Sequence, residues 1–193
     1  MSDRTILWRR IDLPGHDACS LRAAENGWHV TGTALFSLNG RPCRLAYTVD
    51  CDRAWQARTA NVTGSIGTEG VEVNIVAISG RRWALNGREQ PQVTGCVDVD
   101  LNFTPSTNLI AIRRLALQVG DRCQTPGAWL RFPELELARL EQRYHRVTLD
   151  QYDYEACDVG YAATLQVLES GFVTRYPGLW ELEALEEPQS VAR

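Results

Sequence analysis

The sequence contains no lysine, and all 20 of its basic residues are arginine. The absence of lysine excludes Schiff-base chemistry, attachment of pyridoxal phosphate and a lysine-bearing phosphate loop. A GC-rich coding sequence explains this bias more simply than a need for 20 arginine-specific sites. Basic charge is not in excess either, because 24 acidic residues leave a net charge of −4. The chain therefore offers no basic field for nucleic acid, and no nucleic-acid partner is expected.

Long apolar runs are also missing. The first ten residues lack the apolar core of a secretory signal. No apolar run approaches the roughly 18 residues that a membrane helix needs. The sequence as given predicts a cytoplasmic protein with no integral membrane segment.

Cysteine-based and catalytic signatures are sparse. The six cysteines form no Cys-x-x-Cys pair, so zinc ribbons and thioredoxin chemistry are unsupported. A cytoplasmic chain of 193 residues buries a sizeable core without cross-links, so reduced and mostly buried thiols are expected. The three histidines are isolated, and no Gly-x-Ser-x-Gly, His-Glu-x-x-His or glycine-rich phosphate loop occurs. No cofactor and no metal are predicted.

Short segments of alternating polarity, separated by turn residues, occupy most of the chain. Segments 28–38 and 43–51 are joined by Asn39-Gly40, which favours a two-residue hairpin because both turn residues need positive φ. A second strand pair is expected between 92–103 and 109–119. Segment 134–146 is ambiguous between helix and strand, with strand favoured. About a dozen short strands predict an all-β sandwich, barrel or roll with little helix.

One domain is expected. No shift in composition and no repeat of fixed period marks a second unit. Residues 1–183 should form the domain, and 184–193, where acidic residues cluster, should be a frayed C-terminal tail.

The densest polar segment lies between residues 95 and 108. On a strand, Asp98, Asp100, Asn102 and Thr104 would point to one face. Three interpretations stay open: a solvated face, a cleft lining that binds sugar hydroxyls or pairs with arginine, and an acid/base pair of the glycosidase type. Carboxylates two apart on a strand lie roughly 6.5–7 Å from each other. They would sit side by side and not astride a bond, which argues against catalysis.

Arginines and tryptophans supply the remaining candidates. Arg113 and Arg114 follow on the next predicted strand, so one must face the aspartate row and pair with it bidentately. The six tryptophans either pack in the core or line a ligand cavity. Arg58 lies near Trp55, and Trp83 follows an arginine, as a site for an anionic or sugar headgroup would require.

Several short stretches between residues 8 and 182 carry a resemblance when taken in order. They are Gly32-Thr33-Ala34, Arg44 to Asp52, Trp55 with Arg58, Trp83 with Asn86-Gly87, Gly95 to Leu101, Thr104 to Asn108, Ile112-Arg113-Arg114, Ala128 to Pro133, Gln142-Arg143-Tyr144 and Tyr176 to Trp180. Together they resemble the "Putative glycolipid-binding" family, a bacterial family long catalogued as a domain of unknown function. The resemblance implies a single-domain, spiralling β-roll with a partly enclosed cavity, similar in shape to lipoprotein-carrier folds. It also implies a glycolipid ligand.

We therefore expect a non-enzymatic protein that holds a small amphipathic ligand, a glycolipid or another lipid, on a curved sheet. Its acyl part would lie on apolar side chains of the hollow face. The expected ligand-binding residues are Arg58, Trp83, Asn86, Asp98, Asp100, Asn102, Thr104, Asn108, Arg113, Arg114, Arg131 and Tyr144. One alternative is a hydrolase or isomerase that acts on a sugar or lipid headgroup through Asp98 and Asp100, with one raised carboxyl pKa. A second alternative is a protein-interaction module without a small-molecule site.

Overall fold

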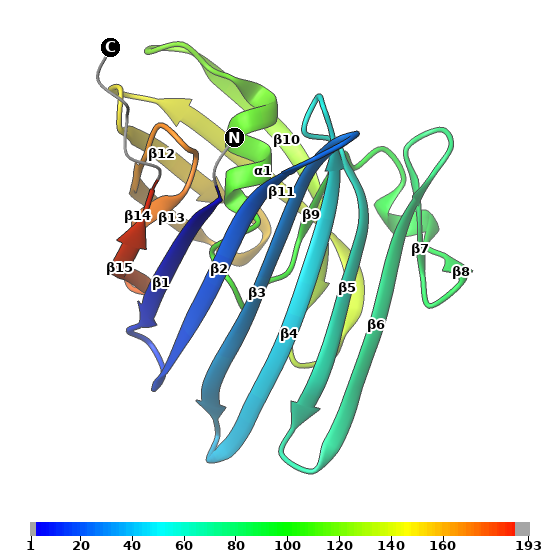
Figure 1. Cartoon of the computed structure of the whole chain (residues 1–193). Helices are drawn as coiled ribbons and strands as arrows, with labels where there is room; N and C mark the ends of the chain where they lie inside the picture. Colours follow the sequence, from blue (N-terminus) through cyan, green and yellow to red (C-terminus); the bar gives the residue numbers. More distant parts are fainter. Residues whose placement is uncertain (1–2, 188–193) are drawn as a thin grey trace.

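The structure, a computed structural model, describes residues 3–187. Within them lie fifteen strands, one α-helix and two 3-10 turns (Figure 1). The first eight strands are β1 (Arg4–Arg10), β2 (Gly15–Ala24), β3 (Gly27–Leu38), β4 (Arg41–Asp52), β5 (Ala57–Ile66), β6 (Glu69–Ile78), β7 (Arg82–Leu85) and β8 (Arg88–Glu89). The other strands are β9 (Asp98–Asp100), β10 (Arg122–Arg131), β11 (Glu136–Arg146), β12 (Gln151–Ala156), β13 (Tyr161–Val167), β14 (Val173–Tyr176) and β15 (Trp180–Glu186). The helix α1 spans Asn108–Leu115, and the 3-10 turns are Pro91–Val93 and Cys157–Val159.

All fifteen strands belong to one sheet, in the order β8 to β1 followed by β15 to β9. Each half of the chain is an antiparallel meander, and the two meanders join where β1 pairs with β15. The short strand β9 pairs in parallel with β10 at one end of the order. The sheet of the described residues is open, because its end strands β8 and β9 each have one neighbour. The predicted all-β class, with many short and mostly antiparallel strands, is confirmed.

Turn chemistry sets the register of the central hairpin. Leu38 pairs with Arg41 across the turn, and Asn39 (φ 51°) and Gly40 (φ 75°) both take the left-handed conformation predicted for this dipeptide. Segment 134–146, for which strand was favoured, forms β11 and pairs with both β10 and β12.

The second predicted strand pair is wrong. Segment 92–103 contains only the strand β9 and part of a 3-10 turn, and 109–119 lies largely in the helix α1. Figure 1 shows α1 between the front strands β1–β6 and the strands β10–β13 behind them. The helix residues from Asn108 to Ile112 are buried, and the apolar ones, Leu109 to Ile112, contribute to both apolar clusters of the core. The apolar run from Leu109 to Ile112 is short, and so short a run does not distinguish a buried helix from a strand by its period.

The C-terminal boundary also differs from the prediction. Ala184, Leu185 and Glu186 belong to β15 and pair with β1, so the sheet extends past residue 183. The pairing supplies backbone hydrogen bonds that a frayed tail would lack. Residues 188–193 of the predicted tail lie outside the described residues.

Side chains fill the space enclosed by the curved sheet. Trp8 and Trp83 are fully buried, and each indole has a partner: Trp8 Nε1 donates to the Val173 carbonyl (2.6 Å) and Trp83 Nε1 to that of Cys96 (2.9 Å). Burying each large apolar side chain contributes about 1.5–3 kcal/mol. Trp55 and Trp180 are buried as well, so four of the six tryptophans belong to the core, and Trp180 also borders the pocket described below. Within residues 3–187, no helix is long and apolar enough to span a membrane.

Candidate functional site

A pocket of about 290 Å³ opens beside Asp100. We call it the Asp100 pocket and define it by its thirteen lining residues. Four of them are polar: Asp100, Asn102, Thr104 and Asn108. The rest are aromatic or apolar: Trp129, Leu140, Tyr154, Ala156, Val159, Tyr161, Tyr176, Leu179 and Trp180. All four polar residues were among the predicted ligand-binding residues.

A sharp turn after β9 brings these polar residues to the pocket. Asp100 ends β9, where it pairs with Trp129 of β10. Asn102 then takes a left-handed conformation (φ 50°), which asparagine tolerates better than most residues. The chain next enters the interior, where Thr104 is buried, and α1 begins at Asn108. The predicted single row of alternating side chains from Asp98 to Thr104 is therefore wrong, because the strand ends at Asp100.

Asp100 is held by two neutral donors. Its Oδ1 accepts the Asn102 backbone N–H (2.8 Å), and its Oδ2 accepts Nε2 of Gln142 (2.8 Å). Gln142 is buried and also donates to the Tyr154 hydroxyl (3.0 Å). Burial raises the pKa of Asp100, and these hydrogen bonds oppose the increase. Gln142 therefore fixes both a carboxylate and a tyrosine of the pocket.

The two asparagines of the pocket, Asn102 and Asn108, have different hydrogen-bond partners. Asn102 Oδ1 accepts the backbone N–H of Phe132 (3.1 Å), which leaves its side-chain amide group free to donate. Asn108 is buried, and its Nδ2 donates to the hydroxyl of Tyr144 (3.0 Å). Tyr144 itself is fully buried, so this predicted ligand-binding residue lies behind Asn108 and not in the pocket.

A buried acid lies behind Thr104. Asp17 of β2 is completely buried and accepts hydrogen bonds from the hydroxyls of Tyr47 (3.0 Å) and Thr104. Thr104 Oγ1 also lies 2.9 Å from Ser106 Oγ. Burial raises the pKa of Asp17 to about 7. The sequence analysis did not identify Asp17. Asp17 lies two residues before the buried Cys19 on the same strand, so the alternation of side chains would have indicated that it points inward.

Tyrosines from three strands form the aromatic wall. The ring of Tyr176 lies 5.8 Å from Tyr154 and 5.4 Å from Tyr161, both in edge-to-face geometry. The hydroxyl of Tyr161 donates to the Pro177 carbonyl (2.6 Å). Such packing fixes the ring orientations. These tyrosines were not predicted as site residues. The clustering of tyrosines in residues 152–176 is the feature of the sequence that could have indicated an aromatic site.

Asp98 and Arg114 form a buried ion pair next to the pocket. Arg114 donates from Nε to Asp98 Oδ1 (2.7 Å) and from Nη2 to Oδ2 (2.5 Å), and also to Thr125 Oγ1 (2.7 Å). Asp98 is only 2% exposed. The bidentate pairing matches the prediction, but both arginines lie in the last turn of α1 and not on a strand. Strand alternation was therefore the wrong reason.

Arg113 lies away from the Asp100 pocket. It donates to the carbonyl of Glu169 (3.0 Å), and its guanidinium lies 5.3 Å from the ring centre of Trp55. Arg58 is exposed and pairs with Asp52 at the β4–β5 corner. Neither arginine lines the pocket.

The other predicted residues have structural positions. Trp83 is in the core, as described above. Asn86 occupies a left-handed turn (φ 49°), and its Oδ1 accepts the Asn74 backbone N–H (2.8 Å). Arg131 is half-buried, 3.9 Å from Glu134. The structure thus gathers four of the twelve predicted residues around the pocket and places the others elsewhere.

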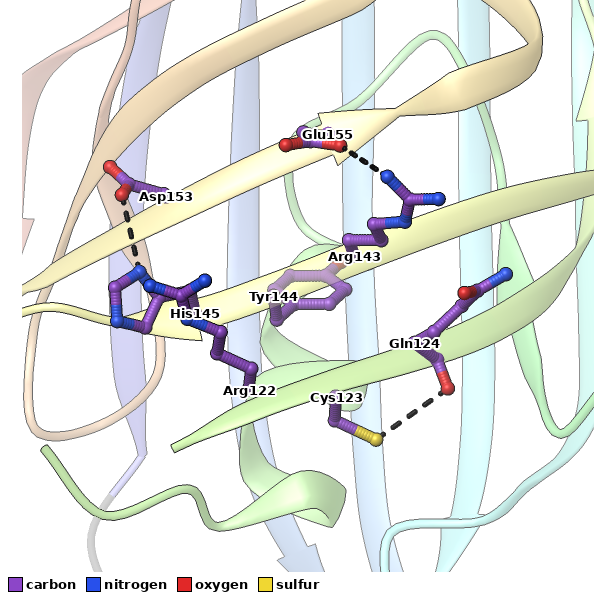
Figure 2. A pocket seen from close by; sticks show the side chains of 8 residues that line it. All are labelled: Arg122, Cys123, Gln124, Arg143, Tyr144, His145, Asp153 and Glu155. Carbon is purple, nitrogen blue, oxygen red and sulfur yellow. Dashed lines mark hydrogen bonds and ion pairs between the residues drawn. The ribbon is translucent and has the colours of Figure 1, made fainter. Parts of the chain in front are cut away.

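A second hollow, of about 390 Å³, lies over β10–β12 (Figure 2). Cross-strand polar pairs line it: Arg143 forms an ion pair with Glu155 (3.1 Å), and His145 Nδ1 lies 3.3 Å from Asp153 Oδ2. These side chains alternate with buried tyrosines, so they lie on the outer face. Exposed ion pairs contribute about 0–1 kcal/mol each to stability. We therefore interpret this groove as a solvated face of the sheet.

Comparisons with known proteins agree with the sequence resemblance. The family model described as "Putative glycolipid-binding" matches residues 5–182. The fold is similar to the crystal structure of a DUF1089 family protein (PA1994) from Pseudomonas aeruginosa, with a TM-score of 0.76 and 28% sequence identity. That match covers 86% of this chain and 91% of the other. No protein of curated function matches the chain.

Proposed function

The chain belongs to the "Putative glycolipid-binding" family, and we propose that it binds the sugar headgroup of a glycolipid in the Asp100 pocket without altering it chemically. The observation that carries the proposal is the combination of aromatic rings with a carboxylate and two carboxamides around one pocket. Aromatic faces cover the C–H face of a sugar ring, and carboxylate and amide groups bind its hydroxyls. Apolar walls with a few convergent polar groups are typical of small-molecule sites.

The lipid tail remains outside the core in this proposal. Side chains fill the space inside the sheet, and the pocket's 290 Å³ is just below the roughly 300–1,000 Å³ usual for ligand sites. Both observations argue against the expectation that the hollow face of the sheet encloses an acyl chain. Val159, which is 52% exposed, and Leu179 line the pocket and offer apolar surface to the first methylene groups.

The ion pair beside the pocket weighs against the enzymatic alternative. Glycosidase chemistry of the common type uses two carboxyl groups that flank the scissile bond. Asp98 is buried and bound bidentately by Arg114, so it does not reach a substrate in the pocket. Asp100 is the one carboxylate among the lining residues.

Ligand binding is tested with defined glycosides. We expect octyl β-D-glucoside or octyl β-D-galactoside, titrated below the micelle concentration, to bind the protein and raise its melting temperature. Trp129→Leu should weaken binding about three- to tenfold, because an aromatic contact contributes about 0.5–1.5 kcal/mol beyond its buried area. Native mass spectrometry of protein purified from cells provides an independent measurement of bound lipid.

The control variant is His145→Gln, which alters the outer groove of Figure 2 and should leave binding unchanged. A loss of binding in this variant, with none in Trp129→Leu, would move the site to the outer face. If neither glycoside binds and no lipid accompanies the purified protein, the proposed function is wrong.

A further inference from the structure

The Asp100 pocket contains a single ionisable acid and no basic side chain. The thirteen residues that line it, all within the described part of the chain, include Asp100 but no arginine or histidine. This composition is notable in a chain with 20 arginines. The nearby guanidinium of Arg114 is already bound by Asp98. Burial raises the pKa of Tyr161 to about 12 and keeps its hydroxyl neutral, so the tyrosine adds no charge.

Asp100 keeps acceptor capacity that the protein does not use. A carboxylate offers about four lone-pair sites, and the two described hydrogen bonds, from Asn102 N and Gln142 Nε2, occupy one on each oxygen. Each oxygen can therefore accept one more hydroxyl, which suits two neighbouring hydroxyls of a sugar ring. The amides of Asn102 and Asn108 supply donors for ring oxygens nearby.

An anionic ligand would meet this carboxylate with no basic side chain among the lining residues. Its binding would enclose two like charges in a half-buried, aromatic-walled site, where charges interact more strongly than in bulk water. A ligand's anionic group would also bring no new donor to Asp100, whose remaining sites are acceptors. Charge repulsion from Asp100 and the loss of the ligand's hydration both weaken the binding of an anionic ligand. A binding site can achieve specificity in this way, by disfavouring the wrong ligand.

We propose that the pocket selects uncharged sugar headgroups over anionic ones, and that Asp100 is the residue that determines this specificity. The proposal rests on the proposed function and deepens it. It names neutral glycosides as the ligand class and excludes uronic acid, sulfated and phosphorylated headgroups.

The experiment compares matched pairs of sugars that differ in charge. The probes are octyl β-D-glucoside with octyl β-D-glucuronide, and the corresponding galactose pair, titrated by calorimetry at pH 8. The protein should bind the neutral member of the preferred pair at least tenfold more tightly. In Asp100→Asn, which removes the charge at almost constant volume, the ratio should fall to about threefold or less. Glu155→Gln makes the same charge change on the outer face and should retain the original ratio.

The outcomes separate this inference from the proposed function. Equal binding of neutral and anionic sugars, or an unchanged ratio in Asp100→Asn, would overturn the inference while leaving sugar binding in place. Binding of the anionic sugars alone would likewise overturn only the inference. If none of the four sugars binds and no lipid accompanies the purified protein, both proposals are wrong. The comparison in the unaltered protein needs no variant, so it decides the selectivity even if Asp100→Asn does not fold.

Discussion

Asp17 should make the protein less stable as the pH rises through neutrality. Its carboxyl is fully buried, and the groups that face it are the hydroxyls of Tyr47 and Thr104 and the thiol of Cys19, none of which is cationic. Trp8 and Ala34 flank it on the neighbouring strands. Burial raises the pKa of Asp17 from 3.8 to about 7, and the two hydroxyl hydrogen bonds offset only part of the increase.

The magnitude follows from proton linkage. Between about pH 4 and 7 the folded protein keeps the Asp17 proton, whereas the unfolded chain has released it. The unfolded state binds fewer protons in this range, so the free energy of unfolding falls as the pH rises. The increase of this pKa from 3.8 to about 7 corresponds to roughly 4 kcal/mol in total, of which about 2 kcal/mol is lost between pH 5 and 7.

Urea unfolding at pH 5, 6, 7 and 8, followed by tryptophan fluorescence, measures this effect. The variant Asp17→Asn cannot ionise, so the difference in unfolding free energy between the two proteins isolates the titration. That difference should shift by about 2 kcal/mol in favour of the variant between pH 5 and pH 7, whichever protein is more stable at pH 5. The exposed Glu155→Gln serves as a control and should differ from the unaltered protein by about 0.5 kcal/mol or less.

A difference between Asp17→Asn and the unaltered protein that stays constant from pH 5 to pH 8 would refute the reasoning. It would mean that Asp17 ionises at the same pH in the folded and unfolded chains. The comparison requires that the unfolding free energy has the same slope against urea concentration in both proteins, because a changed slope indicates a changed unfolded state.

Three further predictions concern other parts of the molecule. In urea unfolding, Arg114→Met should lower the unfolding free energy by about 3–5 kcal/mol, because it leaves the Asp98 carboxylate buried without a counter-ion. Adding Asp98→Asn to this variant should restore part of the loss. Gly64→Ala should lower the melting temperature by several degrees in calorimetry, because φ is +148° and the new Cβ would lie 1.8 Å from a carbonyl oxygen of β4. A thiol reagent should modify exposed Cys157 rapidly in the native protein, whereas Cys51, whose pKa burial raises to about 12, should react only after unfolding, as peptide mapping would show.

The sequence determined the class of fold and part of the candidate site. Strands buried on one side alternate in polarity, so the meanders were predictable from local pattern. The Asn39-Gly40 turn was predictable because few residues tolerate positive φ. The segment from Asp98 to Asn108 was identified as polar and dense, and four of its residues line the pocket.

The tertiary structure decided how that segment is used. Residues 109–115 were expected on a strand, but the turn at Asn102 directs the chain into the interior and these residues form a helix there. The short apolar run from Leu109 to Ile112 does not distinguish helix from strand by its period. The tyrosines of the aromatic wall are distant in sequence from Asp100, and only the pairing of β9 with β10, followed by the meander to β15, brings them together. Local sequence reports which side of a strand is buried, but it carries no information about which distant strand will face it.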